Sequence, residues 1–172
     1  MSSALPPKPR IIGRKSRICI VASKYNETFT DALVDNAVEE LAELAPQSKV
    51  EIIRVPGGFE VPVTVAAVIE REQPSCVIAL GLIIRGATQH GDLIAESITQ
   101  GLQNIAISTK CPIIHEVLLV NDEKQAYARC IGDTLNRGKE AARAAAVMLD
   151  VFHELERSTS RNNPSRPIPR NA

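Results

Sequence analysis

Residues 76–84 read CVIALGLII, and RGATQH follows directly at residues 85–90. The first stretch is an unbroken apolar run of the length of one strand, which is typical of a strand that is buried on both faces. The second stretch combines a cation, two small residues, a hydroxyl, an amide and an imidazole. Polar groups of this kind behind a buried strand predict a ligand site rather than another piece of core.

The same alternation continues on both sides of this stretch. Further apolar runs predict strands over residues 17–23, 49–56 and 111–120. Apolar residues at helical spacing predict helices over residues 29–45, 60–71 and 91–108. Thr30 is the expected N-cap of the first helix, and Pro62 fits only the first turn of the second. From residue 123 to about residue 156 the pattern is helical, with a break near residues 132–136.

Strands and helices in strict alternation predict an α/β fold. Right-handed crossovers then give a parallel sheet with helices on both faces. Ligands of such sheets bind beyond the carboxyl ends of the strands. These ends read SKYNE (23–27), PGGFE (56–60), RGATQH (85–90) and HEVL (115–118), and all four are expected at one edge of the sheet.

The two ends of the chain differ from this alternating region. Residues 1–16 are rich in proline and basic residues and predict an extended arm. Residues 157–172 contain arginines and no acidic residue, and they predict a basic, disordered tail. One domain is therefore expected over residues 17–156.

The composition argues against several classes of protein. Lys plus Arg and Asp plus Glu number 20 each, so nucleic acid is not expected as the main partner. No stretch approaches the ~20 apolar residues of a membrane span, and the first residues lack the apolar core of a signal peptide. The four cysteines show neither a CxxC pair nor zinc-ligand spacing. We therefore expect a cytoplasmic protein with reduced thiols, no membrane segment and no metal.

Each strand end offers a functional and a structural interpretation. Tyr25 can stack on a planar heterocycle, or it can cover the helix below as a hydrophobic lid. Gly57 and Gly58 let a backbone approach a ligand closely. Glu60 can accept hydrogen bonds from sugar-like hydroxyls, or it can cap a tight turn at a helix N-terminus.

The RGATQH segment offers the most specific functional hypothesis, which is anion binding next to a proton carrier. Gly86, Ala87 and Thr88 precede a helix, so free N–H groups and a hydroxyl can cradle an anion there. His90 is the strongest candidate for a proton carrier, although a lone histidine is more often a surface or capping residue. His115 is either a second titrating group or a satisfied core imidazole, whereas His153 has no evident role.

Arg129 lies in the helical segment YARC and also has two interpretations. It can clamp a phosphate, or it can be a surface arginine paired with a carboxylate such as Glu123. The residues alone do not decide between these.

Four segments, in this order and spacing, resemble the lumazine synthase family: RICIVASKYNE, VPGGFEVP, ALGLIIRGATQHGD and NRGKEAA. The likeness spans about residues 17–155. It implies a flavodoxin-like three-layer α/β/α sandwich with a four-stranded parallel sheet. Members are transferases of riboflavin biosynthesis that condense 5-amino-6-(D-ribitylamino)uracil with 3,4-dihydroxy-2-butanone 4-phosphate to give 6,7-dimethyl-8-ribityllumazine, phosphate and water.

The resemblance also implies how such proteins assemble. Family members use no metal or organic cofactor, and their sites lie between neighbouring subunits of a homopentamer. In many members twelve pentamers close into an icosahedral capsid of 60 subunits, and riboflavin synthase is a partner to consider. For this chain the resemblance implies a pentamer as the minimum unit, with the arm along an adjacent subunit.

Position by position, the resemblance assigns one group of residues to the pyrimidine substrate. Tyr25 takes the place of the family's stacking aromatic, and Asn26 follows it. Gly58, Phe59 and Glu60 would hold the ribityl chain. The main chain of Leu82, Ile83 and Ile84 would form hydrogen bonds with the edge of the uracil ring.

A second group is assigned to the other substrate. Ala87 and Thr88 would bind the phosphate of the butanone, and His90 would donate and accept protons. Arg129 from the adjacent subunit would complete the phosphate contacts.

This sequence departs from the family pattern at several positions. His115 stands where a phenylalanine is usual, so a substrate-binding wall gains a polar group. Gly91 replaces an aromatic residue after the histidine, and Asp133 and Arg137 occupy positions that are usually basic. One alternative is therefore a non-catalytic relative that binds flavin or lumazine or only forms a shell, and another is an unrelated flavodoxin-like phosphate- or nucleotide-binding module.

Overall fold

The computed structural model describes residues 4–161, and its centre is one sheet of four parallel strands. They stand in the order β2-β1-β3-β4, and their bounds are β1 (Arg17–Ser23), β2 (Lys49–Val55), β3 (Cys76–Ile84) and β4 (Ile113–Val120). β3 pairs with β1 on one side and with β4 on the other. Its first seven residues are all buried, which explains the unbroken apolar run.

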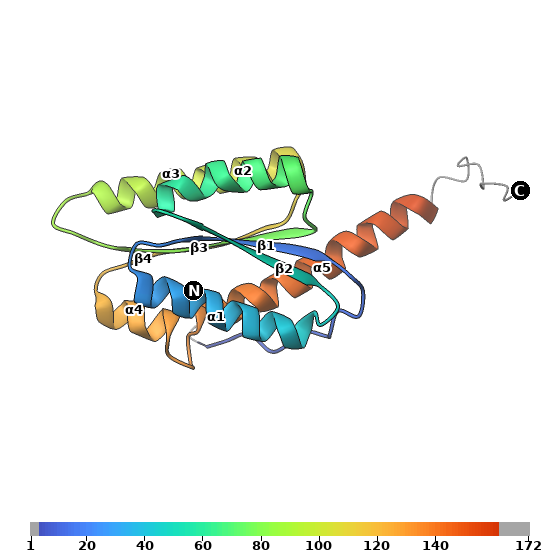
Figure 1. Ribbon diagram of the computed structural model, residues 1–172, viewed down its shortest axis with the longest axis horizontal. Helices are drawn as coiled ribbons and strands as arrows, with labels where there is room; N and C mark the ends of the chain where they lie inside the picture. The colour runs from blue at the N-terminus through green and yellow to red at the C-terminus, as the bar shows by residue number, and fades with distance from the viewer. Residues whose placement is uncertain (1–3, 162–172) are drawn as a thin grey trace, which may run out of the picture.

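Helices cover both faces of the sheet, so the chain folds in three layers (Figure 1). On one face lie α2 (Val61–Glu72) and α3 (His90–Thr109), and a short 3₁₀ turn, Gly58–Glu60, leads into α2. On the other face lie α1 (Glu27–Leu44), α4 (Glu123–Cys130) and α5 (Arg137–Arg161). The expected α/β three-layer, flavodoxin-like fold is confirmed.

The core is divided by the sheet into two apolar clusters. Ile18 and Ile20 of β1 pack into the cluster beneath α1 and α5. Cys19 and Val21 pack into the cluster beneath α2 and α3. Successive residues of one strand thus serve opposite layers, as the alternation of side chains along a strand requires.

The strand boundaries agree well with the sequence pattern. The bounds of β1 and β3 are confirmed, whereas β2 ends one residue before Pro56 and β4 begins at Ile113 rather than Cys111. Pro62 lies in the first turn of α2, as expected. The predicted break near residues 132–136 is confirmed, because α4 ends at Cys130 and α5 begins at Arg137.

The predicted start of the first helix is wrong. α1 begins at Glu27, and Asn26 occupies the N-cap position with a left-handed backbone (φ 60°). Thr30 is buried inside the helix, where its hydroxyl donates to the Glu27 carbonyl oxygen. The helix starts earlier than the apolar pattern because the turn after β1 is short and closes at once into α1.

Both chain ends differ from expectation where the structure describes them. α5 continues to Arg161, so the first five residues of the predicted disordered tail (157–161) are helical. The rest of that tail, residues 162–172, lies outside the described residues.

The N-terminal arm lies against its own chain rather than extending away from it. Residues 4–16 form neither helix nor strand, as expected. Ile12 is buried, and its N–H donates to the Leu44 carbonyl oxygen at the end of α1. Arg10 and Arg14 both pair with Asp150 of α5. These contacts place the arm along α1 and α5, whereas the resemblance implied a place along an adjacent subunit.

Gly138→Ala is expected to destabilise the fold, because the backbone of α1 leaves no room for a methyl group. A Cβ at this position would lie 2.5 Å from the Leu33 carbonyl oxygen and 2.9 Å from the Asn36 Cβ. Overpacking costs about 1–3 kcal/mol, more than the ~0.4–1 kcal/mol by which alanine otherwise stabilises a site that tolerates it. Thermal unfolding should show a melting temperature lower by roughly 2–8 °C.

The matched control is Gly13→Ala, because a Cβ at Gly13 would meet open space. Its melting temperature should equal or slightly exceed that of the parent, because alanine at a site that tolerates it stabilises by ~0.4–1 kcal/mol. An unchanged melting temperature for Gly138→Ala would contradict the close approach of α1 and α5.

Candidate active site

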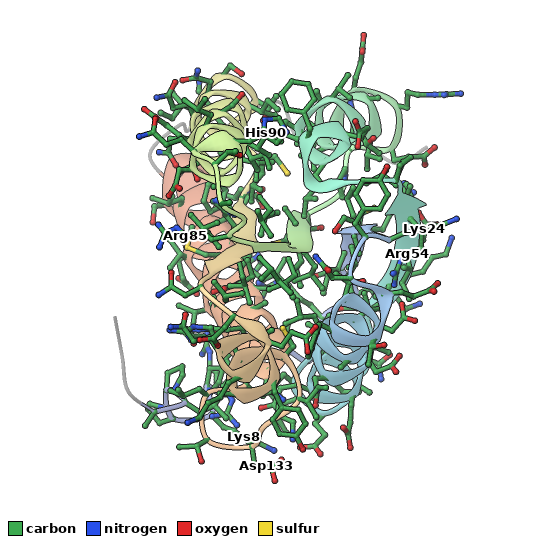
Figure 2. The ribbon with its side chains drawn as sticks, turned by 90° about the vertical axis from the view of Figure 1, so that its left-hand side faces the viewer. Lys8, Lys24, Arg54, Arg85, His90 and Asp133 are labelled. Atoms are coloured by element: carbon green, nitrogen blue, oxygen red, sulfur yellow. The ribbon has the colours of Figure 1, made fainter. Side chains whose placement is uncertain are left out.

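A hollow of about 790 Å³ lies at the carboxyl ends of the central strands. Figure 2 looks onto this edge of the sheet and shows His90 at the start of α3, with Lys24 and Arg54 on the β2 side. The hollow is built from the connections that follow β1, β2 and β3. Its lining residues are Tyr25, Asn26, Pro56, Gly57, Gly58, Phe59, Glu60, Leu82, Ile83, Ile84, Gly86, Thr88, His90, Gly91 and Ile94.

Most of the residues singled out from the sequence meet in this hollow. From three separate connections it gathers Tyr25, Asn26, Gly58, Phe59, Glu60, Leu82, Ile83, Ile84, Thr88 and His90. Ala87 is exposed in the same loop but does not line the hollow, and His115 and Arg129 do not line it either. Pro56, Gly91 and Ile94 also line the hollow, although the sequence pattern assigns none of them to the site.

The turn after β1 presents an aromatic ring to solvent. Tyr25 is 68% exposed, so the interpretation as a lid over a helix is wrong. The ring lies over Gly57, where a Cβ would come within 2.9 Å of two of its carbons. The side-chain amide of Asn26 donates to the Leu82 carbonyl oxygen at 2.9 Å, which ties this turn to β3.

β3 runs beyond the end of β1 into the hollow. Its pairing with β1 stops at Leu80, whereas its pairing with β4 continues to Ile84. On the β1 side, the main chain from Leu82 onward therefore has no strand partner and faces the hollow. The Leu82 carbonyl oxygen already accepts from Asn26, and a carbonyl oxygen can accept a second hydrogen bond.

The PGGFE segment shows that Glu60 caps a turn. One of its carboxylate oxygens accepts from the Gly57 N–H at 2.8 Å. The other accepts no hydrogen bond from the described part of the chain, so it remains available at the hollow. The capping interpretation is confirmed and leaves one acceptor for hydroxyl groups.

The RGATQH segment ends at the N-terminus of α3. Gln89 holds the N-cap position without a side-chain cap, so its side chain satisfies none of the helix's first N–H groups. Thr88 and His90 are exposed beside these groups. The Arg85 guanidinium is bound elsewhere, to Asp92 at 2.7 Å and to Asn121 at 2.6 Å. The loop can therefore receive an anion through N–H groups, a hydroxyl and an imidazole.

His115 is engaged within its own chain. Its Nε2 lies 2.9 Å from the Thr99 hydroxyl, and its Nδ1 accepts from the Val117 N–H at 3.1 Å. Burial lowers the pKa of the imidazole. These contacts fit a neutral, satisfied ring between β4 and α3, away from the hollow of its own chain.

Arg129 is half-buried on α4, across the sheet from α3 (Figure 1). It makes no hydrogen bond or ion pair with residues 4–158, so the alternative pairing with Glu123 is wrong. Its place on the opposite face keeps it from the hollow of its own chain.

The other departures from the family pattern occupy distinct surroundings. Gly91 borders the hollow, where a Cβ would lie 3.3 Å from the Ile83 side chain. Asp133 is exposed in the loop between α4 and α5. Arg137 is buried and pairs with Glu140, beside Glu116 of β4. Burial raises the pKa of Glu116 to about 7, partly offset by the nearby Arg137 charge.

The described side chains contain no group of three or more His, Cys, Asp or Glu residues arranged to hold a metal ion. Within the same part of the chain, no helix has the length and apolarity needed to cross a membrane. All four cysteines are free and buried.

Comparison with known proteins gives one consistent result. Residues 15–153 match the family model described as 6,7-dimethyl-8-ribityllumazine synthase. A protein of that name from Paracidovorax citrulli is 38% identical over 147 residues, 85% of this chain and 93% of the relative. Another, from Halorhodospira halophila, is 36% identical over 82% of this chain and 91% of the relative. A third, from Thermococcus gammatolerans, is 34% identical over 84% of this chain and 93% of the relative.

A solved GDP-L-fucose synthetase from Naegleria fowleri bound to NADP aligns with a TM-score of 0.40 at 13% identity, over 94% of this chain and 50% of that one. So low a score supports no conclusion.

Glu116→Gln is expected to stabilise the fold above pH 7 and to leave it nearly unchanged below pH 4.5. The pKa of this carboxyl is about 7 in the folded chain, against an ordinary value of 4.5. Its contribution to stability is therefore fully present below the lower value and is lost as pH rises through the higher one. Glutamine does not ionise, so the variant should gain on the order of 1–3 kcal/mol at alkaline pH.

Urea unfolding at acidic and alkaline pH measures this difference. Glu70→Gln, on the exposed side of α2, is the matched control and should show no pH-dependent gain. If Glu116→Gln were equally neutral at both pH values, the surroundings of Glu116 would not raise the pKa of its carboxyl.

Proposed function

The chain belongs to the 6,7-dimethyl-8-ribityllumazine synthase family, and we propose that its strand-end hollow is the main part of that enzyme's active site. The enzyme is a transferase of riboflavin biosynthesis. It condenses 5-amino-6-(D-ribitylamino)uracil with 3,4-dihydroxy-2-butanone 4-phosphate. The observation that carries the proposal is the meeting of Tyr25, Glu60, Thr88 and His90, from three separate connections, around one cavity of about 790 Å³.

The pyrimidine binds on the β1–β2 side of the hollow. The exposed Tyr25 ring offers a face for stacking, and the unpaired main chain beyond Leu82 offers donors and acceptors to the uracil edge. The ribityl hydroxyls reach Glu60 and the backbone of Gly58 and Phe59. The free oxygen of Glu60 supports this arrangement.

His90 carries protons between the reacting groups. The amine of the pyrimidine must add to the ketone, water and phosphate must leave, and a second ring must close. Each step moves a proton, and an imidazole can both donate and accept one. The rest of the acceleration comes from holding two small molecules together, so no covalent nucleophile is required.

The butanone phosphate binds at the loop before α3, through Ala87 and Thr88. Only Glu60 among the lining residues carries a full charge, and it is negative. A phosphate therefore needs a cation from outside this hollow. Arg129 has no partner among the described side chains and lies on the far face of its own chain. Both facts support its contribution to the site of a neighbouring subunit, and we assign His115 to that same site because it does not line the hollow of its own chain.

The assembly is therefore a homopentamer at minimum, and a 60-subunit shell is the larger form. The exposed stripe Val147, Val151 and Leu155 on α5 supports contact with other subunits. A cytoplasmic location, supported by four reduced and buried thiols, belongs to the same proposal. Riboflavin synthase, which would use the product, is the partner to test, and no cofactor is required.

The second candidate function is a non-catalytic lumazine- or flavin-binding protein. The three departures His115, Gly91 and Asp133 favour it, because they change walls and charges around the family site. His90 and Arg129 favour the enzyme, since a binding protein needs neither. Mixing both substrates with the purified protein and following the absorbance of the lumazine decides between the two.

His90→Ala is expected to lower kcat by about 10²-fold and to weaken the binding of the substrates far less. General acid–base assistance contributes ~10²–10⁴-fold, and the condensation is feasible without a catalyst, so the lower end applies. Steady-state rates of lumazine formation measure this. His153→Ala, on α5, is the control and should turn over like the parent. If His90→Ala and the parent had equal kcat values, His90 would not be the group that transfers protons.

Arg129→Ala is expected to raise the KM for the butanone phosphate and to leave the binding of a ribityl-pyrimidine analogue intact. A charge-assisted contact contributes on the order of 1.5–3 kcal/mol. Lys124→Ala, an exposed residue on the same helix, is the control.

Co-expression tests whether the site is shared. Mixed oligomers of His90→Ala and Arg129→Ala chains should recover part of the parent activity, because some sites then receive both native residues. Light scattering on the parent should report a pentamer or a larger assembly. A monomer, or mixed oligomers without recovery, would contradict the role of Arg129.

A further inference from the structure

Arg54, at the end of β2, reaches across to the connection between β1 and α1. Its Nη2 donates to the Ser23 carbonyl oxygen at 3.1 Å and to the Thr30 hydroxyl at 3.2 Å. Its Nη1 pairs with the Asp31 carboxylate at 2.7 Å. The side chain is 23% exposed, and its Nε is buried without a partner in the described residues. Both terminal nitrogens of the guanidinium therefore bind groups on either side of this connection.

The partners of Arg54 stand on both sides of a three-residue turn. Ser23 is the last residue of β1, whereas Thr30 and Asp31 lie at the start of α1. The Thr30 hydroxyl in turn donates to the Glu27 carbonyl oxygen at 3.3 Å, which carries the link to the first residue of the helix. The turn between them, residues 24–26, supplies Tyr25 and Asn26 to the hollow.

This turn has a backbone that its surroundings must hold. Asn26 adopts φ 60°, a left-handed conformation that few residues other than glycine and asparagine adopt. The N–H groups of Lys24 and Tyr25 donate to the Val55 and Pro56 carbonyl oxygens, at 2.8 and 3.0 Å. These bonds fix the first two residues of the turn to the end of β2. Arg54, one residue before Val55, binds the last residue of β1 and the start of α1, which lie on either side of the turn.

The Tyr25 ring depends on these backbone anchors. A ring that is 68% exposed is not held in place by burial. Its direction follows from the turn that carries it and from the flat surface of Gly57 below it. A shift of the turn therefore moves the stacking ring directly.

We propose that Arg54 is a positioning residue for the pyrimidine substrate: it holds the β1–α1 turn so that Tyr25 and Asn26 face the hollow. The role rests on the proposed function of the hollow. Arg54 is not among the lining residues, and Figure 2 shows it on the β2 side, apart from His90. None of its partners belongs to the loop at residues 85–90. Its loss therefore affects one substrate and spares the other.

Kinetics of Arg54→Met with both substrates test this selectivity. The KM for the ribitylaminouracil should rise about tenfold, because a displacement of roughly 1 Å at a site can cost that much or more. The KM for the butanone phosphate and the kcat at saturation should stay within about twofold of the parent, since Arg54 lies apart from the phosphate loop and His90. The affinity for 6,7-dimethyl-8-ribityllumazine, read from its own fluorescence, should fall by the same factor as the pyrimidine KM rises.

Arg54→Lys provides the conservative variant and also serves if Arg54→Met does not fold. Lysine keeps a cation beside Asp31 but lacks the planar fork that reaches several acceptors, so it should recover part of the pyrimidine affinity. Arg17→Met is the matched control, because Arg17 pairs with Glu72 at the opposite end of β1. It should leave both KM values unchanged.

Two results would overturn the proposal. One is a pyrimidine KM in Arg54→Met equal to that of the parent. The other is an equal rise of both KM values together with a lower melting temperature, which would make Arg54 a purely structural residue. Failure of the proposed function looks different, because the parent itself would then form no lumazine. In that event the fluorescence titration still tests whether Arg54 positions the turn for a ribityl-lumazine ligand.

Discussion

The parallel pairing of β3 between β1 and β4 is the constraint on which the rest of the structure depends. A strand that is buried on both faces tolerates almost no polar side chain, since burying an unpaired polar group costs several kcal/mol. The chemistry of this chain must therefore lie in the connections. Because all strands are parallel, the connections that follow them meet at one edge, and the hollow forms there.

The sequence pattern predicted the elements that this constraint controls and missed those set by contacts between residues distant in sequence. β1 and β3 are central strands, and their polar flanks mark their ends clearly. The edge strands β2 and β4 are partly exposed, so the pattern marks their ends less sharply. Thr30 failed as an N-cap because Asn26, held by a hydrogen bond to β3, starts the helix four residues earlier. The helix propensities of residues 26–30 give no indication of this hydrogen bond, because its acceptor lies on β3.

The same distinction applies to the site. Tyr25, Glu60 and His90 were found because each has a side chain that can do chemistry. Gly91 contributes only the space that a missing side chain leaves, and such space is recognised only when its neighbours are known. Arg54 gives no signal either, since its partners come from a strand end and a helix turn that are distant in sequence. Its role exists only in the folded chain.

The charge of the hollow supports the proposal that a second chain completes the site. The loop before α3 offers N–H groups and the positive end of a helix dipole, worth roughly half an elementary charge. A phosphate monoester carries nearly two negative charges at neutral pH. Glu60 adds a further negative charge, and the nearby Arg85 is already neutralised by Asp92. These charges leave more than two negative charges uncompensated, and the unpaired Arg129 of a neighbouring subunit would offset one of them. On this proposal, electrostatics would link assembly to catalysis, because an isolated chain could bind the neutral pyrimidine but would hold the phosphate only weakly.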